Sequence, residues 1–132
     1  MTKKLLGGLF VMVCLAVPLS AHHAANAKYD ERKPITIKGT VTKVEWMNPH
    51  IYFYVDAKDA NGAVTNWAVE GGTPNQLYRK GWRKDSLKIG DTVTVEGFAA
   101  KDQGLHHVNG RNVTLPDGRK VYAGSNDGLP TQ

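Results

Sequence analysis

One short helix signature, set among segments patterned as β-strands, constrains the fold of this chain more than any other feature. Thr73 can serve as the N-cap, with Gln76 as its reciprocal partner in a capping box. Pro74 suits the first helical position, and Gly81 can end the helix in the left-handed conformation. The signature therefore predicts about two turns of helix between Pro74 and Lys80.

Strand patterns lie on both sides of this helix. From Ile35 apolar and polar residues alternate with the period of a half-buried strand, and the phase slips before Val44, as a bulge in a long strand requires. Asn61-Gly62 is a strong hairpin signal. Residues 101–110 are rich in glycine and polar side chains, so we expect a loop there. Strands are expected at residues 35–46, 51–55, 64–69, 92–98, 111–115 and 120–122.

The order of these elements predicts a small OB-fold. Three strands, a short helix and two further strands follow one another as in that five-stranded barrel, and a C-terminal hairpin is added. A small β-sandwich is the alternative, because strand order alone does not fix barrel closure. We expect an all-β domain over residues 35–124, an extended N-terminal arm at 22–34 and a disordered tail at 125–132.

The first residues predict a cleavable signal peptide, and therefore a periplasmic or secreted protein. Lys3 and Lys4 precede an apolar run to Leu19 that is too short for a comfortable membrane span. A cut after Ala21 is favoured, which makes residues 1–21 the signal peptide, and Ala25-Asn26-Ala27 is a competing site. A retained N-terminal anchor is the alternative.

Composition narrows the chemistry open to the exported domain. A cut after Ala21 leaves 111 of the 132 residues, enough for one domain, and removes Cys14, the single cysteine of the chain. Disulfide and thiolate chemistry are then excluded. The cut also removes Lys3 and Lys4 from the 17 basic side chains, so that fifteen remain against 12 acidic ones. A net charge of +3 is no strong signature of any partner.

The sequence favours a binding protein over an enzyme. It contains no nucleophile motif, no phosphate-binding glycine loop and no Cys/His set of the zinc type. Glu45, Glu70 and Glu96 fall within strand segments, and we interpret them as exposed strand charges. An enzyme would be favoured if His50 and either Glu45 or Glu70 lined one deep polar pocket.

Several motifs together resemble a family of small exported bacterial proteins, catalogued as domain of unknown function 6152. The motifs are Gly39-Thr-Val-Thr-Lys-Val-Glu-Trp46, Asn48-Pro49-His50, Trp67-Ala-Val-Glu-Gly-Gly-Thr-Pro74, Leu77-Tyr-Arg-Lys-Gly-Trp82 and Leu87-Lys-Ile-Gly-Asp-Thr-Val-Thr-Val-Glu-Gly97. A His-His pair soon after the signal peptide belongs to the same resemblance. The resemblance implies export and a small β domain, and it implies no established activity.

The histidines predict a metal site. All five lie at three places, which are the new N-terminus and the loops after the first and fourth strands. Those two loops lie near the same ligand-binding face of an OB-fold. Imidazole with a thioether suits copper, and a free amine on the first residue would add a chelating group. Alternatively, these are ordinary loop histidines and the Asn-Pro-His motif only shapes a turn. The candidate metal ligands are His22, His23, Met47, His50, His106 and His107.

A second candidate site combines cations with aromatic rings. In residues 78–84 four cations are interleaved with two aromatic residues, a composition that can hold anions while stacking on rings. With three further aromatic residues it would form a surface for an envelope ligand or protein, whereas export argues against nucleic acid. Alternatively, Trp82 fills the core and the cations are a solvated helix edge. The candidate residues are Arg79, Lys80, Trp82, Arg83, Lys84, Tyr52, Tyr54 and Trp67.

Overall fold

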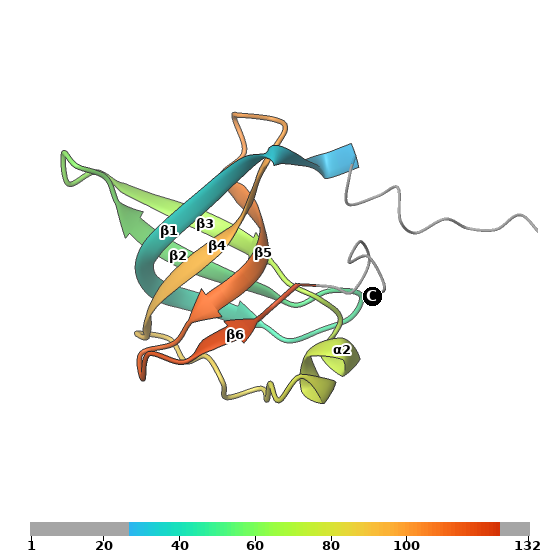
Figure 1. Cartoon of the computed structure of the whole chain (residues 1–132). Coiled ribbons are helices and arrows are strands. Elements are labelled where there is room, and N and C mark those ends of the chain that lie inside the picture. Colours follow the sequence, from blue (N-terminus) through green and yellow to red (C-terminus); the bar gives the residue numbers. More distant parts are fainter. Residues whose placement is uncertain (1–26, 125–132) are drawn as a thin grey trace, which may run out of the picture.

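The computed structural model describes residues 27–124, whose strands curl into a ring with the helix at one end (Figure 1). The predicted signal peptide, the beginning of the predicted arm and the predicted tail lie outside these residues. The elements are β1 (Tyr29–Glu45), β2 (Tyr52–Lys58), β3 (Val64–Glu70), α2 (Pro74–Arg79), β4 (Thr92–Ala100), β5 (His107–Thr114) and β6 (Lys120–Tyr122).

Five of the described strands form a nearly closed ring. Hydrogen bonds join the strands in the order β3-β2-β1-β4-β5-β6, and a parallel pairing between β3 and β5 brings the two ends of the ring together. That pairing runs from Ala68 opposite His107 to Glu70 opposite Asn109. Strand β6 pairs with β5 as the C-terminal hairpin. The prediction of an all-β, OB-like fold with one short helix is thus confirmed.

The long strand β1 serves both halves of the ring because it bends and slips register. Its first half pairs with β4 and its second half with β2. A register shift between Val41 and Lys43 confirms the predicted bulge. At Gly39, where the two pairings overlap, a Cβ atom would lie 2.1 Å from the carbonyl oxygen of Asp56. Only glycine allows the two backbones to approach so closely.

Helix α2 confirms its sequence signature. Thr73 Oγ1 accepts a hydrogen bond from the Gln76 amide, and Gln76 Oε1 accepts one from the Thr73 amide, each at 3.2 Å. Pro74 begins the helix, and Gly81 follows its end with a φ of +91°. The helix carries Leu77 into the core, where this side chain is fully buried.

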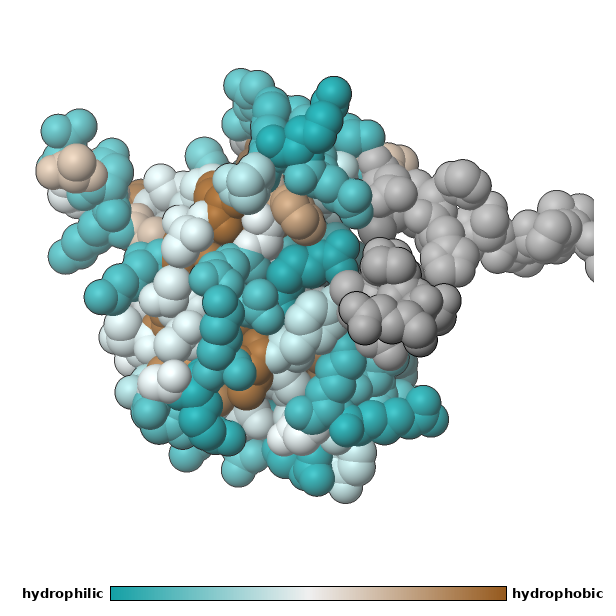
Figure 2. Space-filling view, in the orientation of Figure 1, coloured by the Kyte–Doolittle hydropathy of each residue, from teal (hydrophilic) through white to brown (hydrophobic). Residues whose placement is uncertain are grey.

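The core fills the ring with the inward side chains of the strands. Trp82, which follows α2, is 3% exposed, and its Nε1 donates a hydrogen bond to the Tyr122 carbonyl oxygen at 2.9 Å. The interpretation of Trp82 as a core residue is therefore confirmed. On the face shown in Figure 2, hydrophilic side chains predominate and apolar atoms appear in narrow stretches between them. The core residues are Ile37, Val41, Ile51, Phe53, Val55, Val69, Leu77, Trp82, Leu87, Val93, Val95, Val108, Val113, Leu115 and Ala123.

Strand β1 begins earlier than its pattern predicts. It starts at Tyr29 rather than at Ile35, within the segment expected to be an extended arm. Tyr29 pairs with Ala100 at the end of β4, and the Lys101 amide donates a hydrogen bond to the Lys28 carbonyl oxygen at 3.0 Å. A partner strand therefore stabilises a segment that has no apolar alternation of its own.

Strand β5 also begins earlier, at His107 rather than at Arg111. The prediction of a loop over residues 101–110 is wrong for its last four residues. His107 pairs with β3, Gly110 pairs with β4, and the two residues between them pair with both strands; Val108 is fully buried. The predicted loop glycine Gly110 opposes Gly97 of β4, and a Cβ atom on Gly97 would lie 2.1 Å from the Asn109 carbonyl oxygen.

Candidate functional site

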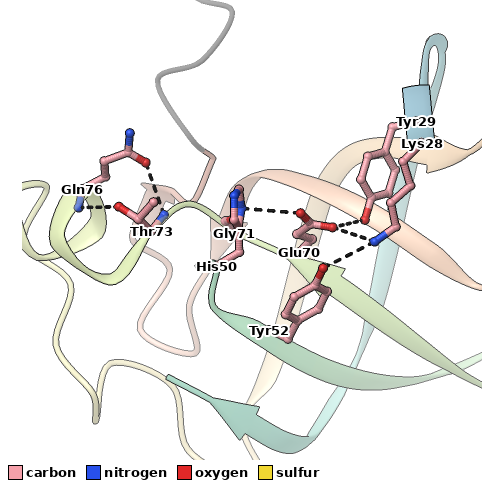
Figure 3. A network of polar contacts seen from close by, with 8 residues as sticks. All are labelled: Lys28, Tyr29, His50, Tyr52, Glu70, Gly71, Thr73 and Gln76. Atoms are coloured by element: carbon pink, nitrogen blue, oxygen red, sulfur yellow. Dashed lines mark hydrogen bonds and ion pairs between the residues drawn. The ribbon is translucent and has the colours of Figure 1, made fainter. Parts of the chain in front are cut away.

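A polar cluster gathers around Glu70, the last residue of β3 (Figure 3). Lys28 Nζ donates a hydrogen bond to Glu70 Oε2 at 2.8 Å, and the Tyr29 hydroxyl donates one to the same oxygen at 2.6 Å. On the other side of the carboxylate, His50 Nδ1 lies 3.4 Å from Glu70 Oε1. The Tyr52 hydroxyl lies 3.4 Å from Lys28 Nζ. We call these five residues the Glu70 cluster.

Three segments that are distant in sequence build this cluster. Tyr52 opens β2 and lies directly opposite Glu70 in the β2–β3 ladder. Lys28 immediately precedes β1 and is held by the hydrogen bond from the Lys101 amide. His50 comes from the loop between β1 and β2, directly before the buried residue that leads into β2. The closing end of the ring thus positions the cluster.

Glu70 is not the exposed strand charge that its sequence context suggests, because its side chain is only 17% exposed. Burial by itself raises the pKa of Glu70. The hydrogen bonds from Lys28 and Tyr29, the nearby Tyr52 hydroxyl and the Lys28 charge more than offset that effect, so the pKa lies below its usual value. Burial and the Glu70 carboxylate raise the pKa of both tyrosines. At neutral pH an ionised carboxylate therefore lies among neutral hydroxyl groups.

His50 is oriented by its contacts with the end of β3. Its Nδ1 lies 2.8 Å from the Gly71 carbonyl oxygen, which can only accept, so Nδ1 carries a proton. In the neutral ring the lone pair then lies on Nε2. Metal-binding histidines have this arrangement, in which one ring nitrogen is bonded to a carbonyl or carboxylate and the other faces the metal.

The other predicted metal ligands have separate contacts or lie outside the described residues. His106 packs edge-on against Trp67, with ring centroids 5.1 Å apart, and Met47 is 55% exposed in the loop before His50. Within residues 27–124, no group of three or more His, Cys, Asp or Glu side chains could hold a metal ion. His22 and His23 lie outside the residues that the structure describes.

His107 lies beside the Glu70 cluster and has the environment of a neutral histidine. Its Nδ1 is buried without a hydrogen-bond partner. Burial lowers the pKa of His107, the charges of Lys28 and His106 lower it further, and Glu70 opposes this shift in part. This candidate ligand is the first residue of β5 and does not lie in the predicted loop.

The cations near α2 are mostly engaged with the protein itself. The Arg83 guanidinium stacks on the Tyr78 ring at 3.9 Å and donates hydrogen bonds to two backbone carbonyls. Lys80 Nζ lies 3.9 Å from the centre of the Tyr122 ring and donates to the Gly124 carbonyl oxygen at 3.3 Å. Arg79 and Lys84 are exposed.

The aromatic residues predicted to join these cations lie at different places. Trp82 is in the core, and Tyr52 belongs to the Glu70 cluster. The Tyr54 hydroxyl donates to Glu45 Oε2 at 3.1 Å, and Trp67 contacts His106. The residues of the predicted basic and aromatic surface therefore lie at separate places. The part of it that remains together is the stack of Arg83 on Tyr78 near α2.

An enzyme would be favoured by a deep polar pocket lined by His50 and a glutamate. His50 and Glu70 are adjacent, which meets one part of this condition. The Glu70 carboxylate is bonded to Lys28 and Tyr29. Three hollows on the described surface, around residues 35–38, 29–32 and 96–98, are lined by neither His50 nor Glu70.

The sequence did not reveal Lys28 and Tyr29 as members of the cluster, nor Arg111 as a largely buried side chain. A single aromatic residue in the segment 22–34, which has no apolar alternation, is a usable signal for Tyr29, because a large ring is commonly buried against a partner. No local signal marks Arg111.

The fold and the cluster define the class of this protein as a small OB-like β domain with a partly buried polar cluster at the closing end of its ring. Over residues 10–109 the chain matches a family described as a family of unknown function (DUF6152), and it belongs to that family. The resemblance of its motifs is thereby confirmed. No curated protein matches the chain significantly.

In the part of the chain that the structure describes, no helix is both long and apolar enough to cross a membrane.

Proposed function

We propose that this protein is an exported metal-binding protein that holds copper through His50, with His22 and His23 of the processed N-terminus as further ligands. One observation carries the proposal. His50 Nδ1 is hydrogen-bonded to the Gly71 carbonyl oxygen at 2.8 Å. The Nε2 lone pair is therefore directed away from that contact, and it is the lone pair that would bind a metal. Imidazole ligands suit copper.

The Glu70 cluster supports the participation of the N-terminal histidines. Lys28 and His50 contact the two oxygens of the same carboxylate. His23 precedes Lys28 by five residues, and five residues span at most about 17 Å. We propose that the arm folds back over the cluster and brings both N-terminal imidazoles to His50. Cleavage after Ala21 would also free the α-amine of His22 as a chelating group.

Calorimetric titration of the processed chain, residues 22–132, with Cu(II) tests the proposal, with Cu(I) under reducing conditions as a second arm. We expect one site with a Kd of about 1 µM or tighter. The variant His50→Asn keeps a donor for Gly71 but loses Nε2, and we expect it to weaken binding by at least about tenfold. A chain that begins at Lys28 keeps the Glu70 contacts and should also bind more weakly.

The matched control is His106→Asn, which removes an imidazole that packs against Trp67. It should leave the affinity within about twofold of the parent chain, since a ligand substitution costs far more. Millimolar affinity, or a His50→Asn variant that binds as tightly as the parent, would contradict the proposal.

A second candidate function is a module for an envelope ligand or protein, favoured by the exposed stack near α2. Tyr78 is 58% exposed beneath Arg83, with Arg79 and Lys84 on the same short segment. Capture experiments from an envelope extract should lose the partner when these three cations are changed to glutamine. The charge-matched control changes three exposed lysines elsewhere to glutamine, namely Lys33, Lys38 and Lys58. An unchanged set of captured proteins counts against this candidate.

A further inference from the structure

Arg111 of β5 is a largely buried cation whose hydrogen bonds are incomplete. Its side chain is 17% exposed, and one terminal nitrogen, Nη1, donates to the Tyr122 hydroxyl at 3.1 Å. The other, Nη2, lies 3.8 Å from Glu31 Oε1, beyond hydrogen-bond distance, and Nε is buried without a partner. Nη2 therefore lacks a close acceptor, whereas Nε is closed to solvent.

A second cation lies close to Arg111 and leaves positive charge in excess there. Lys80 Nζ lies over the ring of Tyr122, the residue that accepts from Arg111. Burial lowers the pKa of Lys80, and the Arg111 charge lowers it further. Glu31, the acid paired with Arg111, has a side chain that is 59% exposed and is therefore a weak counter-charge. A partly desolvated cation of this kind favours an anion.

The same arginine borders a hollow of about 310 Å³ between β1, β4 and β5. Apolar atoms of Pro34, Ile35 and Phe98 form much of its wall. The Arg111 guanidinium lies over the Phe98 ring, 5.5 Å from its centre, and Asn112 adds an amide to the rim. The hollow thus combines a cation at one side with an apolar floor, which suits a ligand that has one acidic group and an apolar body.

Glu96 limits the charge that such a ligand can carry. It borders the same hollow, and its pKa is lowered by the hydrogen bond from Lys120, so it is ionised at neutral pH. A second negative group on the ligand would meet this carboxylate. A monocarboxylate therefore fits the hollow better than a phosphate or a dicarboxylate.

We propose that Arg111 binds the carboxylate of a small, singly charged ligand whose apolar body lies in this hollow against Phe98. The ligand carboxylate accepts a hydrogen bond from Nη2 and replaces Glu31 there. This site shares no residue with the proposed metal site, and it does not depend on that proposal.

Titration followed by amide NMR spectra of the processed chain tests the site, with 4-phenylbutyrate as the probe and its amide, 4-phenylbutanamide, as the uncharged control. We expect saturable shifts confined to residues 35–36, 96–98 and 110–112 for the acid. The amide should bind at least about tenfold more weakly, since a charge-assisted pair is lost. Equal binding of the two probes, or no saturable shift at these residues, would overturn the proposal.

Variants separate a specific site from general attraction of anions. Arg111→Lys keeps the charge but loses the planar guanidinium that presents Nη2, and we expect about tenfold weaker binding of the acid. Glu31→Gln changes an exposed side chain and removes the competing carboxylate, so it should tighten binding. Arg119→Lys, at a residue whose side chain is 70% exposed in the β5–β6 turn, is the matched control. The proposal fails if Glu31→Gln does not tighten binding, or if Arg119→Lys weakens it as much as Arg111→Lys.

Discussion

Replacing Glu70 by glutamine tests how the N-terminal segment is held on the ring. Glutamine has the shape of glutamate but carries no charge, so Lys28 and Tyr29 keep only a neutral acceptor. The two short hydrogen bonds to Oε2, at 2.8 Å from Lys28 and 2.6 Å from Tyr29, lose their charge assistance. The substitution therefore weakens the contact between β1 and the end of β3 without leaving a cavity.

The expected magnitude follows from the exposure of each partner. A hydrogen bond to a charged group contributes about 1.5–3 kcal/mol to stability, and a neutral one about 0.5–1.5 kcal/mol. The Lys28 side chain is 37% exposed, so screening by water reduces its share to well under 1 kcal/mol. Tyr29 is 3% exposed and retains a difference of about 1 kcal/mol. We expect Glu70→Gln to lower the free energy of unfolding by about 1–2 kcal/mol at neutral pH.

Urea unfolding measures this change, and amide hydrogen exchange locates it. The amide of Lys101, which donates to the Lys28 carbonyl oxygen, should exchange faster in Glu70→Gln because the start of β1 opens more often. The matched control is Glu96→Gln, since Glu96 is 41% exposed and paired with Lys120 at 2.6 Å. It should change stability much less. Equal losses in the two variants, or unchanged exchange at Lys101, would refute the reasoning.

Three further substitutions test the core, the close approach of β1 and β2 at Gly39, and the pH response. Trp82→Phe removes volume and the hydrogen bond to the Tyr122 carbonyl, and thermal unfolding should show a loss of about 2–3 kcal/mol. Gly39→Ala places a Cβ 2.1 Å from the Asp56 carbonyl oxygen, so urea unfolding should show a loss of at least about 2 kcal/mol. Because the pKa of His107 is lowered in the folded state, the unfolded chain binds its proton more readily, and stability falls as pH drops below the unfolded value of 6.5. In His107→Asn, urea unfolding should show a smaller fall in stability between about pH 7 and pH 5 than in the parent chain. An equal fall in the two chains would mean that other groups cause the pH dependence.

The sequence predicted those parts of the fold that local chemistry decides. The capping box of Thr73 and Gln76 lies within one helical turn, and the bulge near Val41 appears as a slip of the alternating pattern, so both were accessible without the structure. The order of the elements then indicated an OB-like ring, because few topologies place one short helix between the third and fourth strands.

The parts that were missed depend on partners far along the chain. Tyr29 and Glu70 are 41 residues apart, and only ring closure brings them together. Glu70 looks like an exposed strand charge until the start of β1 covers it. Arg111 likewise becomes largely buried through contacts with Tyr122 and Phe98, which its neighbours in sequence do not reveal.

The claim that His50 is a copper ligand is tested most directly by electron paramagnetic resonance of the processed chain with one equivalent of Cu(II). The account predicts nitrogen hyperfine coupling from imidazole, and loss of one nitrogen together with a changed copper hyperfine constant in His50→Asn. The same spectra recorded on His106→Asn should match those of the parent chain. Identical spectra for the parent chain and His50→Asn would contradict the account, because the copper would then be bound without the residue that the geometry favours.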